Sequence, residues 1–500
     1  MTSRPETPFY LRTEEAPRLP PPITMVGVQG WLIANLFSSI GNAILSVIAG
    51  AFLLWIGWGI FDWALLHAVW TGEDREVCAV EGAGACWPFV GVKFLQWIYG
   101  FYPIDQRWRV NICFILGAAA LVPMLVPSAP YKKWNALFLL IGYPLITLVL
   151  LTGGHFPMSP AAFLSAFIVL ALAAAFLPLI AFGIEEGIQR NRTGLGLAGI
   201  GVLAWLASFV IDFGVLQTAL GSLPSGSIAT AACIGAAGAI GVVQLLGVKD
   251  SGARAALRSW LIGAAVILGI MLVMKIDFGL ESVETSQWGG LLVTLVVAIT
   301  GIVASLPLGI LLALGRRSNM PIVKLCSVVF IEVWRGVPLI TVLFMGSVML
   351  PLFLPEGVTF DKLLRALIVT ALFSSAYMAE VVRGGLQAIP KGQFEAAQAL
   401  GLSFWKMMNL IVLPQALKIV IPGIVNSFIS LFKDTTLVSI IGLYDVLNIV
   451  ITTSGDAKWA SPQTGPTAYF AAALMFWIFC FSMSRYSIFV ERRLQTGHKK

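Results

Sequence analysis

Charged residues are scarce in this sequence. Asp, Glu, Lys and Arg make up 11% of the 500 residues, whereas hydrophobic residues make up 58%. A soluble protein of this length needs much more charge to cover its surface, so a soluble fold is excluded. Several apolar runs exceed the ~20 residues that a helix needs to cross a bilayer. The sequence therefore predicts an all-α polytopic membrane protein.

Several motifs that carry common chemistry are also missing. There is no Gly-x-x-x-x-Gly-Lys-Ser/Thr sequence, so the chain has no P-loop for ATP. The three histidines, His67, His155 and His498, lie far apart, and no two of the six cysteines form a Cys-x-x-Cys pair. No nucleophile with a nearby base is evident. We therefore expect no catalytic residue, no metal site and no cofactor in this chain, and a membrane enzyme is the least favoured class.

The basic residues indicate how the chain is oriented. The net charge of +7 is better explained by basic cytoplasmic loops than by a surface for nucleic acid. Residues 1–39 are polar and proline-rich and lack a signal-peptide pattern, so they are predicted to be a disordered cytoplasmic tail. About twelve apolar segments follow, near residues 42–61, 111–126, 134–151, 161–183, 195–211, 227–246, 260–275, 291–314, 328–352, 364–386, 419–443 and 469–490. Loops with and without basic residues alternate between them, which predicts that both termini are cytoplasmic.

One polar stretch, residues 390–415, interrupts the apolar segments and predicts two short helices. Gly401 is expected to end the first helix with a positive φ, Ser403 to cap the second, and Pro414 to mark the next break. The stretch matches the spacing Glu-Ala-Ala, x3, Gly, x9, Ile-x-Leu-Pro at every position. The matching residues are Glu395, Ala396, Ala397, Gly401, Ile411, Leu413 and Pro414.

This spacing resembles the EAA loop of the permeases of ABC importers. The resemblance implies a cytoplasmic coupling helix that docks onto an ATPase subunit. The residue types suit that role, because small Ala and Gly side chains allow close approach and Glu395 offers one charge near a helix N-terminus. The alternative is an ordinary helical hairpin between two spans.

The chain from Phe278 onward resembles the polar amino acid ABC permeases, on the stretches FIEVWRGVPLITVLF, SSAYMAEVVRGGLQAIPKGQFEAAQALGL and NSFISLFKDTTLVSIIGLYDVL. It is most similar to the larger permease subunit of the general L-amino acid transport system. In that subunit the stretches that correspond to Phe156 and Phe278 are almost adjacent, whereas here four further spans separate them. We therefore divide the chain into a three-span extension with a periplasmic connection (40–155), an inserted four-span segment (156–278) and a type I permease core of five spans (279–500).

The resemblance implies a permease subunit of an ATP-driven importer of L-amino acids in the bacterial inner membrane. It further implies a second homologous permease subunit, a dimer of ATP-binding subunits that hold ATP and Mg²⁺, a periplasmic amino-acid-binding protein, contact with membrane lipid and no contact with nucleic acid. The rival interpretation is a self-sufficient secondary transporter or channel in which the EAA loop is only a scaffold.

Charged residues within the predicted spans are candidates for the substrate path, because a charge in the membrane interior is costly and is usually functional. Glu332 with Arg335, and Glu380 with Arg383, are i,i+3 pairs that can neutralise each other. Pairing that is purely structural and contact with substrate are equally open for these four residues. The sequence from Arg335 to Pro338 is also expected to break its helix and expose backbone groups that a polar ligand could use.

Asp434 differs, because no residue three or four positions away on its helix is basic. It is therefore the best candidate for binding the ammonium group of an amino acid. Lys433 or Arg383 could supply a cation for the carboxylate, and Thr436 and Asn426 could supply polar contacts. The alternative is that Asp434 pairs with a basic residue on another helix and only holds the bundle together.

Cys78 and Cys86 lie in the predicted periplasmic connection, which is an oxidising environment. Their separation permits a disulfide, and two free thiols are about equally compatible with the sequence. The other four cysteines fall in apolar runs and are expected to be packing residues.

Overall fold

The structure is a computed structural model that describes residues 27–126, 128–154, 160–182, 184–207, 215–218, 221–246, 248, 251–353 and 361–494. The chain divides into two compact units. The first contains the chain up to Phe94 together with Val450–Met475, and the second contains Leu95–Ile449 and the chain from Phe476. Helices α3 (Trp87–Tyr99), α20 (Val446–Ser454) and α21 (Thr464–Leu494) each contain residues of both units. The predicted division at residues 155 and 278 stays a prediction.

Ten helices among the described residues are long and apolar enough to cross a membrane. They are Ile40–Leu66, Ile104–Leu125, Lys132–Thr152, Phe163–Phe182, Ser227–Leu246, Gly252–Met274, Gly290–Arg316, Lys362–Ala388, Ile421–Ile441 and Thr464–Leu494. Each corresponds to one predicted segment. The predicted segment at 195–211 is a shorter apolar helix, α9 (Arg192–Ala207).

The predicted segment at 328–352 is not one straight span. It forms α13 (Pro321–Gly336) and α14 (Leu339–Val348), and the pair is bent by 104°. Val337 and Pro338 both have extended backbone angles, because a proline disfavours the helical conformation of the residue before it. The predicted break after Arg335 is therefore confirmed, and the two helices form a broken span or a re-entrant pair.

The first described element of the first unit is a helix that the sequence did not predict. Its elements up to Phe94 are α1 (Gly27–Asn35), α2 (Ile40–Phe61), a π-helical turn η2 (Asp62–Leu66), a 3-10 turn η3 (Glu76–Cys78) and the start of α3. Residues 27–35 were predicted to be disordered but are helical, whereas residues 1–26 of the predicted tail lie outside the described residues. Ser39 caps α2, because its side chain accepts a hydrogen bond from the amide of Asn42 at 3.2 Å.

The predicted permease core lies mostly in the second unit. It comprises η6 (Thr285–Gln287), α12 (Gly290–Arg316), α13, α14, η7 (Leu350–Phe353), α15 (Lys362–Ala388), α16 (Lys391–Ala399), α17 (Phe404–Met407), a π-helical turn η8 (Met408–Val412), α18 (Leu413–Ile419), α19 (Ile421–Asp434), a 3-10 helix η9 (Thr435–Ile441) and β3 (Tyr444–Asp445). Helices α12 and α15 pack closely, since a Cβ atom on Gly309 would lie 2.7 Å from the Cβ of Met378. Together they form the centre of this core.

A buried carboxylate begins α20. Asp445 is fully buried, and it accepts hydrogen bonds from the amides of Leu447 at 2.9 Å and Asn448 at 3.2 Å. Burial raises the pKa of Asp445 to about 6, although these two amide donors act in the opposite direction.

The helices before the insertion pack against the core. They are η4 (Ile104–Gln106), α4 (Arg107–Leu125), α5 (Lys132–Leu137), a π-helical turn η5 (Phe138–Gly142) and α6 (Tyr143–Thr152). Val110 of α4 and Leu151 of α6 share a hydrophobic cluster with Leu292 of α12 and Leu343 of α14. These extension helices therefore contribute to the same hydrophobic interior as the core.

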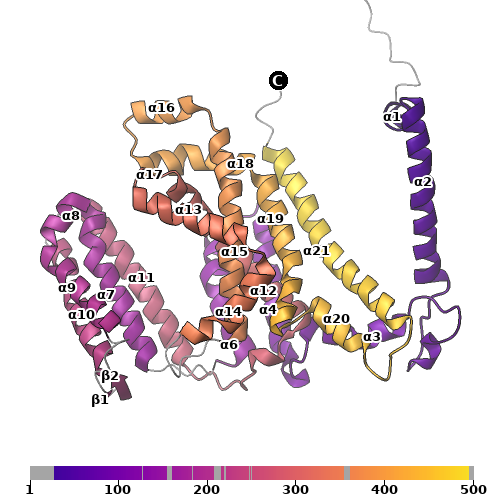
Figure 1. The fold of residues 1–500 in the computed structure, drawn as a ribbon, viewed down its shortest axis with the longest axis horizontal. Helices are drawn as coiled ribbons and strands as arrows, with labels where there is room; N and C mark the ends of the chain where they lie inside the picture. Colours follow the sequence, from indigo (N-terminus) through magenta and orange to yellow (C-terminus); the bar gives the residue numbers. More distant parts are fainter. Residues whose placement is uncertain are drawn as a thin grey trace, which may run out of the picture. The chain divides into compact units, whose positions relative to one another are not determined.

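The inserted segment forms a helical bundle of its own (Figure 1). It comprises α7 (Pro160–Phe182), α8 (Ile184–Arg190), α9, an antiparallel hairpin of β1 (Val215–Thr218) and β2 (Gly221–Pro224), α10 (Ser225–Leu246) and α11 (Ser251–Lys275). Its two ends meet, because a Cβ atom on Gly154 would lie 2.9 Å from the ring of Phe278. The amide of Val283 also donates to the carbonyl of Thr152 at 3.1 Å.

Candidate functional site

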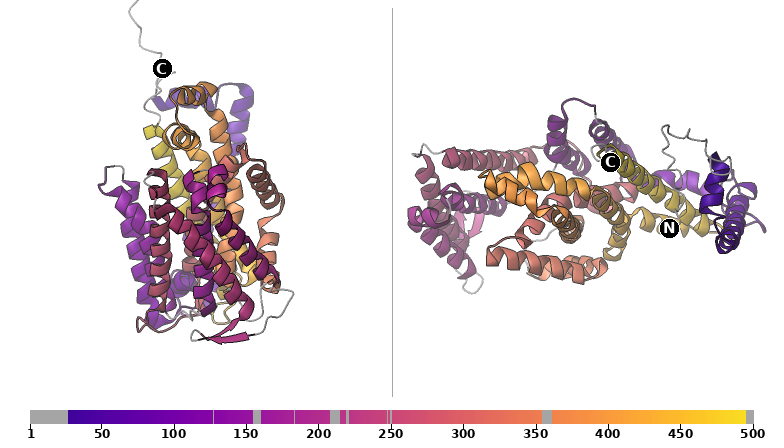
Figure 2. Two further views of the ribbon diagram at one scale, coloured as in Figure 1. Left: turned by 90° about the vertical axis from the view of Figure 1, so that its left-hand side faces the viewer. Right: turned by 90° about the horizontal axis from the view of Figure 1, so that it is seen from above.

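The EAA loop forms a helix pair at one end of the core (Figure 2, orange). Gly401 ends α16 with φ +70°, which confirms the prediction of a positive φ. The amide of Gly401 donates to the carbonyl of Gln398 at 2.9 Å, and the amide of Leu402 donates to that of Ala397 at 3.2 Å. These two bonds are the Schellman pattern that closes a helix C-terminus.

The second part of the loop differs from its prediction. Ser403 precedes α17, but no hydrogen bond from its side chain caps that helix. Pro414 was expected to break the chain, yet it sits in the first turn of α18, which continues from α17 through the π-helical turn η8. Proline is tolerated there because it follows the π-helical turn directly, where the regular hydrogen bonds of the α-helix are interrupted.

The motif residues divide between an inner and an outer face of this helix pair. Ala397 and Leu413 are buried in a cluster with residues of α12 and α15, and Ile411 packs against that cluster. Glu395, Ala396, Gly401 and Pro414 are exposed. Three large apolar side chains are exposed beside them, namely Leu400, Phe404 and Trp405. An exposed surface of this kind suits contact with another protein.

Helix α12 is tied directly to the helix pair. The guanidinium of Arg317 donates to the carbonyl of Leu386 at 3.1 Å, near the end of α15. Its Cζ atom lies 5.2 Å from the centre of the Phe394 ring on α16. Arg317 therefore connects the end of α12 to the end of α15 and to α16.

A cavity of about 300 Å³ lies among α12, α14, α15, α19 and η9. This volume is at the lower end of the range for small-molecule sites. Its polar lining residues are Ser305, Ser374, Tyr377, Asn426, Ser427, Ser430 and Asp434. Its apolar lining residues are Leu339, Phe373, Met378, Phe428, Leu431 and Leu437. The cavity thus combines one carboxylate, several hydroxyl groups and an apolar wall.

Of the lining residues that the structure describes, Asp434 alone carries a formal charge. Among the described residues, its carboxylate has no ion pair within 4.0 Å and no hydrogen bond, and its nearest charged neighbour in sequence, Lys433, is exposed. A half-buried carboxylate in this situation attracts a cationic ligand. The arrangement fits the predicted role of Asp434.

Only one of the other four residues predicted for this site is among the described residues that line the cavity. Asn426 lines the cavity, but Lys433, Thr436 and Arg383 are not among its lining residues. The hydroxyl of Thr436 donates to the carbonyl of Lys433 at 2.9 Å. The expected cation beside the substrate carboxylate is therefore absent from the lining that the structure describes, which offers hydroxyl and amide groups in its place.

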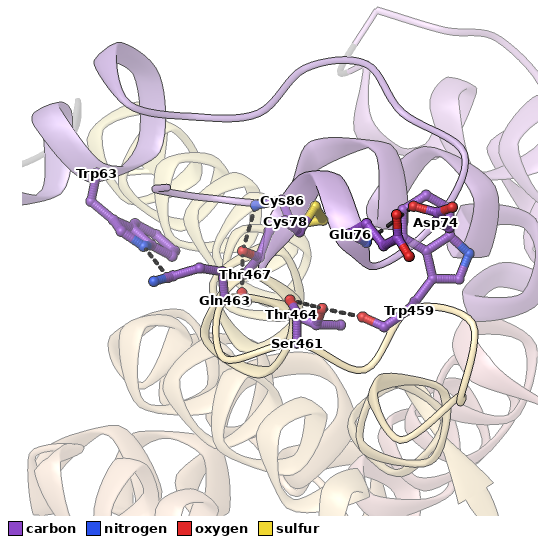
Figure 3. The surroundings of a disulfide bond; sticks show 10 residues. All are labelled: Trp63, Asp74, Glu76, Cys78, Cys86, Trp459, Ser461, Gln463, Thr464 and Thr467. Carbon is purple, nitrogen blue, oxygen red and sulfur yellow. Dashed lines mark hydrogen bonds between the residues drawn. A yellow bond between two sulfur atoms is a disulfide. The ribbon is translucent and has the colours of Figure 1, made fainter. Parts of the chain in front are cut away.

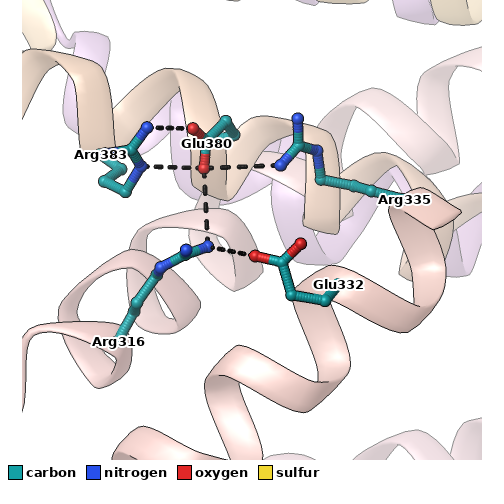
Figure 4. A network of polar contacts seen from close by, with 5 residues as sticks. All are labelled: Arg316, Glu332, Arg335, Glu380 and Arg383. Atoms are coloured by element: carbon teal, nitrogen blue, oxygen red, sulfur yellow. Dashed lines mark hydrogen bonds and ion pairs between the residues drawn. The ribbon is translucent and has the colours of Figure 1, made fainter.

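Five charged residues from α12, α13 and α15 form a network near the helix pair (Figure 4). Glu332 is not paired with Arg335, as an i,i+3 pair would be, but with Arg316 at 2.9 Å. Arg335 instead lies 3.7 Å from Glu380. Glu380 also pairs with Arg383, as predicted, and lies 3.8 Å from Arg316. Contacts between helices thus replaced one of the two local pairs, which sequence spacing cannot reveal.

The first unit holds a disulfide between Cys78 and Cys86, with a Cα–Cα distance of 5.6 Å (Figure 3). The bond closes a short loop within the connection after α2, and hydrogen bonds join this connection to the start of α21 and the residue before it. The amide of Cys86 donates to the hydroxyl of Thr467 at 2.9 Å, and the indole of Trp63 donates to the side chain of Gln463 at 3.0 Å. Both cysteines are fully buried.

Several lining residues, among them Ser374, Tyr377 and Ser430, were missed from the sequence, although a signal was present, whereas Asn426 and Asp434 were predicted. Asn426, Ser430 and Asp434 are spaced four residues apart, so they form one polar stripe along α19. Ser374 and Tyr377 make a similar pair on α15. Arg316 was missed because its partners lie on other helices.

A bundle of membrane-crossing helices around a polar cavity, with a helix pair at one end, defines a membrane transport protein. Residues 305–496 match the family model described as binding-protein-dependent transport system inner membrane component. The chain is 40% identical over 472 residues to the inner membrane amino-acid ABC transporter permease protein YhdY of Escherichia coli. The alignment covers 93% of each chain. The chain therefore belongs to the amino-acid ABC transporter permeases.

The chain is also similar to two further proteins. The chain is 40% identical over 501 residues to the glutamate/glutamine/aspartate/asparagine transport system permease protein BztC of Rhodobacter capsulatus, which covers 98% of this chain and 99% of that protein. Such coverage runs through the inserted segment, so these relatives share it. A solved chain described as an amino acid ABC transporter with histidines is 30% identical, with a TM-score of 0.35, and covers 40% of this chain and 90% of that chain.

Proposed function

We propose that this chain is the permease subunit of an ATP-driven L-amino acid importer, and that substrate binds beside Asp434 on its way through the second unit. The observation that carries the proposal is the cavity itself. It joins one carboxylate, which has no ion pair among the described residues, to hydroxyl groups and an apolar wall. The chain is a multi-pass inner membrane protein, as its family is.

The cavity suits the common part of an amino acid. The ammonium group would bind Asp434, because neither charge is stable without a partner away from water. The substrate carboxylate would accept hydrogen bonds from Ser430 or Asn426, which line the cavity with Asp434. Because one relative is named for glutamate, glutamine, aspartate and asparagine, these four are the first substrates to test.

The exposed surface of α16 and α17 supports a partnership with a separate ATPase dimer, which would hold ATP and Mg²⁺, while this chain binds no cofactor. The remaining partners would be a second permease subunit and a periplasmic amino-acid-binding protein. The helix pair and both termini would then be cytoplasmic. The disulfide would be periplasmic, where thiols are oxidised.

Asp434→Asn tests the substrate site, because it removes the charge and keeps the shape. We expect a ~10- to 100-fold loss in the efficiency of uptake of labelled L-glutamate, L-glutamine, L-aspartate and L-asparagine, which is the usual effect of losing a hydrogen-bonded charge. Copurification of the ATPase should be unchanged. Asp105→Asn is the matched control, since it makes the same change at an exposed carboxylate outside the cavity.

Two results would contradict the assignment. If uptake of every amino acid that the wild type carries is unchanged in Asp434→Asn, the substrate does not use this carboxylate. If instead the variant no longer copurifies with its partners, Asp434 holds the assembly together. This is the alternative in which Asp434 pairs with a basic residue on another helix.

A further inference from the structure

The charged network lies between the cavity and the helix pair of α16 and α17, which we call the coupling helix pair. On α15, Tyr377 lines the cavity, and Glu380 and Arg383 follow about 4.5 and 9 Å further along the helix, toward α16. On the broken pair, Leu339 at the start of α14 lines the cavity, and Arg335 lies four residues before it, on the other side of the bend. A substrate that leaves the cavity toward the helix pair therefore meets these charges.

The network also touches the cavity wall. The Cζ atom of Arg335 lies 5.8 Å from the centre of the Tyr377 ring, and Tyr377 lines the cavity. Glu380 is the centre of the network, since it faces one arginine from each of α12, α13 and α15 (Figure 4). Its side chain thus links three helices at one end of the cavity.

Two of the three helices of the network, α13 and α15, can also neutralise their own charges. Glu332 and Arg335 are one turn apart on α13, so they can pair with each other if α13 moves away. Glu380 and Arg383 on α15 are paired already. Only Arg316 would lose its partners, and it is the last residue of α12, where a positive charge is favoured by the helix dipole.

On the basis of the proposed transport function, we propose that these five residues are a gate between the cavity and the coupling helix pair. In the closed gate the ion pairs run between helices, as they do here, and in the open gate they run within helices. Such an exchange of partners separates α13 from α12 and α15 without leaving a carboxylate unpaired. Arg317, next to Arg316, connects the gate to α16 through Phe394.

Charge reversal with a labelling readout tests the gate. In the assembled transporter, the four cysteines outside the disulfide are replaced by alanine and Ser374→Cys is introduced in the cavity wall. A membrane-impermeant maleimide is then applied from the side of the coupling helix pair, in inside-out vesicles. Arg316→Glu places an anion beside Glu332 and Glu380, so it should raise the labelling rate about tenfold, which corresponds to 1.4 kcal/mol.

The reciprocal variant keeps the test valid if the single change perturbs folding. Arg316→Glu combined with Glu332→Arg restores that ion pair and should return labelling to within about twofold of the parent rate. Lys324→Glu, about 12 Å before Glu332 on the same helix, reverses a charge outside the network and should have no effect. The gate is refuted if Arg316→Glu leaves labelling unchanged, or if the double variant labels as fast as the single one.

The labelling assay needs no substrate, so the two proposals fail separately. Altered labelling in a complex that imports no amino acid would support the gate and refute the proposed function. Normal import with unaltered labelling would refute the gate and support the proposed function.

Discussion

Gly401 offers a direct test of how the coupling helix pair is shaped. Its φ of +70° is the left-handed conformation that glycine adopts readily and other residues avoid. A Cβ atom at this position would meet no other atom within 4 Å, so a substitution adds strain in the backbone and no clash. That strain is about 1–2 kcal/mol for an L-residue, highest for a β-branched one and lowest for asparagine. The order of damage should therefore be Val, then Ala, then Asn.

The assay is copurification of the ATPase from mild detergent together with amino acid uptake. A cost of 2 kcal/mol changes the population of the native turn by about 30-fold, so Gly401→Val should lose most of both signals. Gly401→Asn should keep most of them. Gly392→Val is the matched control, because Gly392 lies on the same helix with equally open space and no positive φ. If Gly401→Val behaves like the wild type, or no worse than Gly392→Val, the turn geometry does not matter for coupling.

Three further predictions follow from the rest of the chain. Joining Gly154 to Phe278 should yield a protein that inserts and transports, and loss of uptake by a well-inserted deletion variant would show that the inserted helices are needed. Replacing Cys78 and Cys86 with alanine should lower the free energy of unfolding by about 2.5 kcal/mol, and mass spectrometry of non-reduced peptides should detect the bond in the wild type. Because the pKa of Asp445 is about 6 in the folded protein, against its usual value of 3.8, the folded state binds more protons between these pH values. Stability should therefore fall by about 2 kcal/mol as pH rises from 4 to 6, and thermal unfolding of Asp445→Asn should lack this dependence.

Features set by neighbouring residues could be predicted from the sequence. The membrane-crossing helices follow from runs of apolar residues, and the break at Val337 and Pro338 follows from the chemistry of proline. The positive φ of Gly401 follows from the spacing around it. Each of these depends on a short stretch of chain, whatever the rest of the fold does.

Features set by packing between helices could not be predicted. Glu332 is three residues from Arg335, yet it pairs with Arg316 of another helix, because α12 and α13 bring these side chains together. The spacing of charges on one helix allows a local pair but does not select it. Likewise, the polar stripe that contains Asp434 was visible in the sequence, but only the packing of α15 and α19 makes it the wall of a cavity.

The two segments that precede the permease core relate to it in different ways. Val110 of α4 and Leu151 of α6 lie in one hydrophobic cluster with Leu292 of α12, so removing the extension helices would expose part of the interior of the core. The inserted helices have two described clusters, and these contain only residues between Leu172 and Trp260. Since the ends of the insertion also meet beside Gly154, its removal leaves the interior of the core intact. The insertion should thus matter for transport only through contacts with partners or lipid, whereas the extension should matter for the stability of the core itself.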